Sequence, residues 1–353
     1  MSVRLHDIAV RAQVSTATVS RVLNGRPGVS DEAREAVLVA IDDLGYERPA
    51  RVRTAATSLI GLIVPELTNP FFTAFAQVVE TALARHGFTP VLCTQTIDTV
   101  HEDDYVRTLL DRGVSGIIFA SGIHAVGDTS PRRYQALRDR GLPIVLVNGY
   151  LPGVDAPFIS TDDAATVDLA VRHLAELGHR RIGLAMGPRR YTPVIRRING
   201  FHEAMRRHLG DAMSRAEVDE LVVCTRYRLE GGFEAARILL DRGATAIIAG
   251  SDVMAFGAIR AARARGLRVP EDVSIIGSDD NEFLEFTDPP LSTVRQDVEA
   301  IGAAAVRTLL DELAGSPPPR AEYIFRPQLV VRASTAPASA PAPAPARVAP
   351  AAE

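Results

Sequence analysis

LLDRGVSGIIFAS (residues 109–121) returns almost unchanged as LLDRGATAIIAGS (residues 239–251). A second pair, IGLIVPE (60–66) and IGLAMGP (182–188), precedes the two copies at a similar distance. Each long copy joins a helical pattern to a short aliphatic run, which is typical of a helix followed by a buried strand. This internal repetition predicts two similar α/β lobes in one chain.

The repeats lie inside a longer alternation of strand and helix patterns that begins at Leu59. The alternation predicts an α/β fold with parallel sheets and helices on both faces, similar to a two-lobed periplasmic binding protein. We assign 59–333 to this domain, with 59–160 and 292–325 in the N-lobe and 161–291 in the C-lobe. Because ligands of open α/β sheets bind outside the carboxyl ends of the strands, we expect a binding cleft between the lobes.

The two ends of the chain have a different character. Residues 1–46 contain three short helical patterns, the third capped by Ser30, and predict a compact three-helix unit. The stretch ERPARVRTAATS (47–58) has almost no apolar periodicity and predicts a linker or hinge. The Ala/Pro-rich end (334–353) cannot bury a core, so we expect a disordered tail there.

Composition narrows the class of protein. A chain of 353 residues with 46% apolar residues can bury a large core, and its net charge of −4 indicates no overall attraction to nucleic acid or membranes. No apolar signal segment opens the sequence and no run approaches a membrane span, which predicts a cytoplasmic protein. Cys93 and Cys224 stand far apart and are expected to be reduced core thiols.

The stretch VSTATVSRVLNG (14–25) is rich in β-branched and hydroxyl residues, which are mediocre helix formers. On a helix starting after Ser15, one face would carry Val19, Val22 and Leu23 and could pack on the other two helices. The opposite face would carry Thr16, Ala17, Ser20, Arg21 and Asn24. Small polar residues let a backbone approach DNA closely, and arginine matches guanine in the major groove. The layout indicates a helix-turn-helix, although a three-helix unit that merely packs fits the spacing too.

The segment LHDIAVRAQVSTATVSRVLNGRPGVSDEAREAVLVAIDDLGYERP resembles the headpiece of the lac repressor (LacI/GalR) family of bacterial transcription regulators. The specific part is V-S-x-x-T-V-S-R-V-L-N, and the resemblance continues to about residue 332. It implies that Thr16, Ala17 and Arg21 face base edges. It also implies that Thr18, Ser20 and Asn24 meet phosphates.

The linker departs from the family pattern, since it is shorter than usual and has Ala50 where asparagine is common. In the family a short hinge helix inserts an apolar wedge into the minor groove of the operator. Val52 is the best match for that wedge, and the alternative is an ordinary solvated linker residue.

The resemblance also implies a small-molecule effector in the cleft. Arg197 and Asp279 would face each other and hold vicinal hydroxyls through charge-assisted hydrogen bonds, although a purely structural salt bridge is the alternative. Phe72 could instead belong to the core at the start of a helix. For Asn148, Ser251 and Gln296 the alternative role is loop capping. The residues implied to bind the effector are Asn69, Phe72, Asn148, Arg197, Tyr227, Ser251, Asp279 and Gln296.

These observations predict a ligand-responsive transcription regulator that acts as a repressor. The resemblance implies a homodimer on a pseudo-palindromic operator, and a sugar is the expected effector because it is the family's commonest. The sequence contains no G-x-S-x-G, Walker A or H-E-x-x-H motif, so we expect no enzyme, metal site or cofactor. A corepressor-dependent regulator and a solute-binding protein of periplasmic type are the alternatives.

Overall fold

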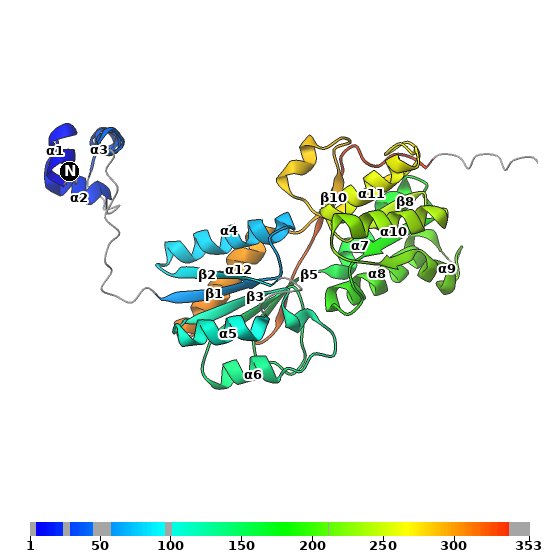
Figure 1. Cartoon of the computed structure of the whole chain (residues 1–353), viewed down its shortest axis with the longest axis horizontal. Helices are drawn as coiled ribbons and strands as arrows, with labels where there is room; N and C mark the ends of the chain where they lie inside the picture. Colours follow the sequence, from blue (N-terminus) through cyan, green and yellow to red (C-terminus); the bar gives the residue numbers. More distant parts are fainter. Residues whose placement is uncertain (1–4, 24–28, 45–57, 96–100, 211, 339–353) are drawn as a thin grey trace, which may run out of the picture. The chain divides into compact units, whose positions relative to one another are not determined.

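The computed structural model describes residues 5–23, 29–44, 58–95, 101–210 and 212–338. The chain divides into two compact units at the boundary between Ala56 and Thr57 (Figure 1). The described part of the first unit contains three helices, α1 (Leu5–Arg11), α2 (Thr16–Leu23) and α3 (Asp31–Asp43). The predicted hinge residues 47–57 lie outside the described residues.

The first unit is held together by a small apolar core. Its fully or nearly buried members are Ile8, Ala9, Ala12, Val19, Val22, Val37 and Ala40. The turn between α1 and α2 passes through Gln13, whose φ of +53° is a left-handed conformation that ends α1. Ser15 then caps α2, since its Oγ accepts a hydrogen bond from the Thr18 N–H at 3.0 Å. Tertiary packing through Val19 and Val22 thus supports a helix with weak intrinsic propensity.

The second unit contains two six-stranded sheets, one in each lobe. In the N-lobe the strand order is β11-β5-β4-β3-β1-β2 and all pairings are parallel. The helices α4 and α12 cover one face of this sheet, and α5 and α6 cover the other (Figure 1). The elements are β1 (Leu59–Val64), α4 (Pro70–Arg85), β2 (Thr89–Thr94), α5 (Glu102–Asp111), β3 (Gly116–Ala120), the 3-10 helix η1 (Ile123–Ala125), α6 (Arg132–Asp139), β4 (Ile144–Val147), β5 (Phe158–Thr161), α12 (Val298–Leu313) and β11 (Glu322–Phe325).

The C-lobe sheet has the order β12-β10-β9-β8-β6-β7, and only its edge strand β12 runs antiparallel. The helices α7 and α8 pack on one face, and α10 and α11 pack on the other. The elements are α7 (Asp163–Glu176), β6 (Ile182–Met186), α8 (Thr192–Leu209), α9 (Arg215–Glu220), β7 (Val222–Cys224), α10 (Leu229–Asp241), β8 (Ala246–Ala249), α11 (Asp252–Ala264), β9 (Ser274–Asp279), the 3-10 helix η2 (Glu282–Phe286), β10 (Ser292–Arg295) and β12 (Gln328–Val330).

The internal repeat marks the same packing contact in both lobes. Leu109 lies over Gly61 of β1, where a Cβ atom would stand only 2.6 Å from Leu109 Cδ1. Leu239 lies over Gly183 of β6, where a Cβ atom would stand 2.9 Å from Leu239 Cδ1. In each lobe a glycine in the first strand therefore makes room for the repeat leucine, and the prediction of two similar lobes is confirmed.

The expected boundary at residue 292 is wrong, because β10 belongs to the C-lobe. Ser292 and Thr293 are fully buried, and β10 pairs with β9 in the register Ser292↔Ile276. After β10 the chain crosses back to the N-lobe, where it forms α12 and β11, and it then returns to the C-lobe as β12. The four-residue pattern of β10 does not reveal which sheet it joins, since the pairing depends on contacts far away in sequence.

The expected start of the tail at residue 334 is also too early. Ser334 is fully buried, its Oγ donates to the Ile275 carbonyl at 2.6 Å, and it accepts from the Ser292 N–H at 2.8 Å. The Ala338 N–H donates to the Leu177 carbonyl at 2.8 Å. Residues 334–338 are thus part of the C-lobe, and the rest of the predicted tail, 339–353, lies outside the described residues.

Within the described ranges, no helix combines the length and apolarity needed to span a bilayer. Cys93 is buried and Cys224 is partly buried, and neither takes part in a disulfide bond. Burial raises the pKa of both thiols. Such thiols are poor nucleophiles and act mainly as small apolar side chains.

Candidate functional site

A cavity of about 350 Å³ lies between the two lobes, at the carboxyl ends of their central strands. The lining includes seven of the residues implied by the family resemblance, which are Asn69, Phe72, Asn148, Arg197, Tyr227, Asp279 and Gln296. It also includes polar residues that the sequence analysis missed, namely Glu66, Gln95, Glu102, Ser121, Arg190, Tyr191, Arg226 and Arg228. Most of these follow a strand directly or begin the next helix, and that position is the signal that could have found them.

Ser251 is the one predicted effector-binding residue that does not line this cavity. It is the N-cap of α11, its Oγ accepts a hydrogen bond from the Met254 N–H at 3.3 Å, and it is 1% exposed. Its neighbour Gly250 lines the cavity instead. The placement favours the alternative of loop capping, because a helix starting at this point needs a side-chain acceptor for its free N–H groups.

Arg197 has a different partner from the one expected. Its Nε donates to Asp163 Oδ1 at 2.9 Å, while Nη1 donates to the Gly250 carbonyl at 3.2 Å and to Ser278 Oγ at 3.3 Å. Both Arg197 and Asp163 are buried. The expected direct pair with Asp279 is not formed, since Asp279 Oδ1 accepts instead from Gln296 Nε2 at 2.6 Å.

Asp279 is nevertheless part of the polar floor of the cavity. Burial raises its pKa, while the positive charge of Arg197 and hydrogen bonds from Gln296 and Asn69 act to lower it. Gln296 also accepts from Thr161 Oγ1 at 2.7 Å, so one amide joins the ends of β5 and β9. Asp279 has a φ of +121°, a strained backbone that is common where function requires a fixed side chain.

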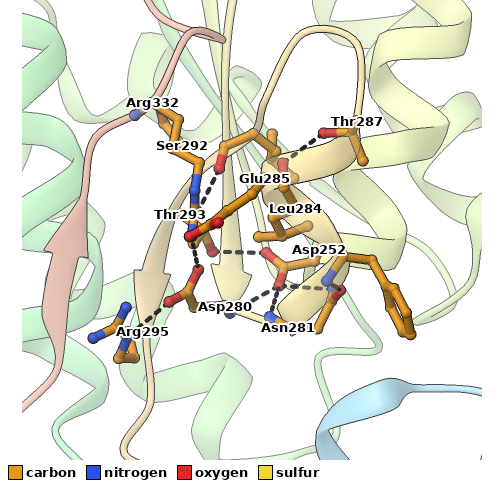
Figure 2. Close-up of polar contacts among 12 residues, drawn as sticks. Asp252, Asp280, Asn281, Leu284, Glu285, Thr287, Ser292, Thr293, Arg295 and Arg332 are labelled. Atoms are coloured by element: carbon orange, nitrogen blue, oxygen red, sulfur yellow. Dashed lines mark hydrogen bonds and ion pairs between the residues drawn. The ribbon is translucent and has the colours of Figure 1, made fainter.

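A network of polar contacts around Asp280, the next residue along the chain, holds this strained segment in place (Figure 2). Asp252 accepts hydrogen bonds from Thr293 Oγ1 at 2.7 Å and from the backbone N–H of Asp280 at 2.8 Å. Asp280 in turn forms ion pairs with Arg295 at 2.6 Å and with Arg332 at 2.7 Å. The network anchors residue 280 away from the cavity and so fixes the direction of the neighbouring carboxylate.

Aromatic rings form the apolar walls. Tyr227 lies against Gly187 and Gly250, where Cβ atoms would stand 2.0 Å and 3.1 Å from its ring. Phe72 is half-buried and lines the cavity, while Phe71 also packs in the lobe core against Phe75, with ring centroids 6.4 Å apart. The arrangement offers flat apolar surfaces beside hydrogen-bonding groups, which suits a sugar or a nucleobase.

Two further predicted residues hold loop ends in position. Asn69 caps α4, since its Oδ1 accepts from the Phe71 N–H at 3.0 Å. Asn148, with a φ of +64°, donates from Nδ2 to Ser121 Oγ at 2.5 Å. Both side chains therefore have a structural partner and still line the cavity. Capping and contact with a ligand are compatible for these two amides.

The lobes also contact each other around the cavity mouth. Arg228 Nη2 lies 3.5 Å from Glu66 Oε2, an ion pair from the C-lobe to the N-lobe. The Gly127 N–H donates to the Arg190 carbonyl at 2.7 Å, and Val126 forms an isolated antiparallel bridge with Tyr191. The cavity is thus bounded by residues of both lobes.

In the first unit, α2 presents the face that the spacing predicts. Thr16, Ala17 and Arg21 are exposed, and Thr18 and Ser20 are partly buried. The Thr18 hydroxyl is within 2.9 Å of Ser15 Oγ, so it belongs to the helix cap. Asn24 and Val52 lie outside the described residues. An exposed face of small side chains with one arginine can approach a groove of DNA closely.

Comparison with known proteins gives two family matches. Residues 4–49 match the bacterial regulatory proteins of the lacI family, and residues 171–335 match a periplasmic binding protein-like domain. The chain is 55% identical to the transcriptional regulator MalR of Streptomyces coelicolor, over 96% of this chain and 98% of that protein.

Two solved structures share the fold over most of the chain. The transcriptional regulator CelR in complex with cellobiose has a TM-score of 0.69 and 32% identity, over 94% of this chain and 99% of that one. The lac repressor dimer bound to operator and the anti-inducer ONPF has a TM-score of 0.67 and 27% identity, over 95% and 100%. Together with the helix-turn-helix and the two-lobed domain, these similarities show that the chain belongs to the lacI family of bacterial transcription regulators.

Proposed function

We propose that this protein is a repressor that binds operator DNA as a homodimer and changes its operator affinity when a sugar occupies the cavity between the lobes. The observation that carries the proposal is that one chain combines the exposed α2 face with a polar and aromatic cavity. The function is therefore one of binding in the cytoplasm rather than of catalysis. The CelR complex with cellobiose and the operator-bound lac repressor dimer support both halves.

On the DNA side, Arg21 supplies the strongest direct contact, since its guanidinium can engage a guanine through two nitrogens. Thr16 and Ala17 add a hydroxyl and a methyl contact, and Thr18 and Ser20 meet phosphates. Each N-terminal unit covers one half-site, so a pseudo-palindromic operator requires two copies of the chain.

On the effector side, the proposal places the ligand against Arg197, Asp279 and Gln296 on the floor and against Phe72 and Tyr227 on the walls. Gln296 occupies the segment where the chain passes from β10 to α12, so a ligand there touches a connection between the lobes. A ligand that binds one arrangement of the lobes more tightly shifts the chain toward it, and that difference changes operator affinity.

The sign of the change separates two forms of the proposal. An inducer weakens operator binding and a corepressor strengthens it. The periplasmic solute-binding alternative is disfavoured, because such a protein has no use for the exposed helix-turn-helix face.

Fluorescence anisotropy with labelled operator and random DNA tests the proposal. Arg21→Ala should weaken operator binding about 10- to 100-fold and random-DNA binding far less, because the fork contact discriminates between bases. Arg34→Ala on α3, outside the predicted reading face of α2, is the matched control and should keep the preference for operator over random DNA. Equal losses for Arg21→Ala on the two DNAs would exclude its base-reading role.

The same assay with added sugar tests the cavity. Arg197→Ala should abolish the change in operator affinity while leaving the ligand-free affinity largely intact. Arg207→Ala, farther along α8, loses an ion pair with Asp168 inside the C-lobe and is the control that should retain the response. A full response from Arg197→Ala would remove this residue from the proposed site.

A further inference from the structure

We infer that Asp163, a residue outside the cavity, sets the charge selectivity of the effector site by neutralising Arg197, so that the cleft selects neutral polyhydroxylated ligands over carboxylates and phosphates. The inference rests on the proposed function and deepens it. Asp163 does not line the cavity, so it acts through Arg197 as a positioning and specificity-determining residue.

The first step is the geometry of the guanidinium. Asp163 holds Nε at 2.9 Å, and the Gly250 carbonyl and Ser278 Oγ hold Nη1. Among the described residues none accepts a hydrogen bond from Nη2, which leaves this nitrogen as the donor for a ligand. A carboxylate or phosphate binds arginine most strongly through two parallel N–H groups. Here the protein has already engaged Nε and Nη1, so the site favours a single bond to a hydroxyl oxygen.

The second step is the charge balance. Asp163 and Arg197 have side chains 4% and 6% exposed, so the pair lies almost entirely out of water and solvent screens it weakly. The adjacent Arg196 does not share this role, because both of its terminal nitrogens bind Glu322, at 2.6 and 2.9 Å. Asp163 therefore neutralises Arg197 one to one. Asp279 adds a further carboxylate to the same floor.

The ionisation of Asp163 is consistent with this balance. Burial raises its pKa to about 6, against the opposing effects of Arg197 and Arg196. At neutral pH the carboxylate is thus mostly ionised and cancels the arginine charge. An anionic ligand then meets no net positive charge at the floor, and desolvating its own charge there is unfavourable. A neutral hydroxyl can donate to Asp279 and accept from Arg197 Nη2.

The experiment compares matched neutral and acidic ligands on the full chain by isothermal titration calorimetry at pH 7.5. The pairs are glucose with glucuronate, maltose with maltobiouronate, and cellobiose with cellobiouronate, in which each acid keeps its pyranose rings. In the wild-type chain, the neutral member of a binding pair should bind at least about tenfold more tightly than its acid. Asp163→Asn keeps a hydrogen-bond acceptor for Nε but removes the charge, and it should reduce this ratio about tenfold or more.

Two variants separate charge from structure. Asp163→Glu keeps a carboxylate at this position and should keep the wild-type ratio of neutral to acidic ligand affinity. Asp162→Asn removes the same charge from the neighbouring N-cap, where Asp162 Oδ1 accepts from the Ala165 N–H at 2.9 Å, and should leave the ratio unchanged. Thermal melting identifies any variant that does not fold. If Asp163→Asn does not fold, the neutral-to-acid affinity ratios of the wild type and of Asp163→Glu test the inference.

The inference is overturned if an acid binds the wild-type chain as tightly as its neutral partner, if no neutral member binds, or if folded Asp163→Asn keeps the wild-type ratio. Operator binding by the ligand-free chain is measured separately. Loss of specific operator binding would contradict the proposed function, whereas an inverted ligand preference with intact operator binding would contradict only the role of Asp163.

Discussion

The two lobes share a core and diverge at the point where the repeat ends. Leu109 and Leu239 fill equivalent sites over Gly61 and Gly183. The last residues of the repeat, Ser121 and Ser251, occupy equivalent sequence positions but have different roles. Ser121 has a φ of +50° and accepts a hydrogen bond from Asn148 beside the cavity, whereas Ser251 caps a helix.

This difference shows how a duplicated fold can acquire an asymmetric site. In the C-lobe the chain continues directly into α11, while in the N-lobe it turns into the short η1 before α6 begins. The N-lobe copy therefore places Ser121 at the cavity, whereas the C-lobe copy places Gly250 there and buries Ser251 in a helix start. Packing residues are retained where both lobes need a core, and cavity-lining residues differ.

The strongest test of the shared core is to remove the repeat leucines. Leu109→Ala and Leu239→Ala should each destabilise the chain by about 2–5 kcal/mol, because each leaves a cavity against a strand glycine. Urea unfolding measures both values, and Ile324→Ala, at a residue that is 56% exposed, serves as the control. If one variant loses less than half as much free energy of unfolding as the other, the two leucine contacts are not equivalent.

Acidification should change the stability contributions of two buried groups, one in each lobe, in opposite directions. Burial lowers the pKa of His124, in η1, to about 4, so its contribution to stability is present above the unfolded pKa near 6.5 and is lost as the pH falls toward 4. At its maximum, this contribution of His124 to the free energy of unfolding is expected to be about 3 kcal/mol. In the C-lobe, Asp163 has a raised pKa of about 6, so its contribution grows as the pH falls from 6 toward 3.8.

Urea unfolding of wild type and His124→Gln at pH 7.5 and pH 5.5 checks the N-lobe part of this prediction. The variant should show a smaller loss on acidification than the wild type, because glutamine does not titrate. His86→Gln, at an exposed histidine, is the control and should behave like the wild type. An identical loss in His124→Gln would contradict the buried neutral state of this imidazole.

The smallest expected effect concerns the two serines. Ser251→Ala removes an N-cap and should cost about 1 kcal/mol while leaving effector affinity unchanged. Ser121→Ala should change stability less, but it frees Asn148 Nδ2 and should alter effector affinity. Calorimetric titration and urea unfolding of both variants separate the two roles. If both variants lose the same stability and change effector affinity in the same way, the two serines have the same role.

The sequence predicted those features that depend on local pattern. The buried Val19 and Val22 and the two-lobed repeat follow from spacing, and seven of the eight residues that the resemblance implies for the effector line the cavity. Asp163 was missed because an acid in the first turn of a helix is ordinary, and only the tertiary fold brings it to Arg197. The assignment of β10 failed for a related reason, since four residues of mixed polarity fit either sheet.

The three passages of the chain between the lobes set an order in which the molecule can be completed during synthesis. The N-lobe lacks α12 and β11 until translation reaches Phe325, and the C-lobe lacks β12 and the buried Ser334 until still later. The helix-turn-helix unit is translated first and has an apolar core made only of its own residues. A nascent chain can thus present its DNA-reading helix well before the sensor that controls it exists.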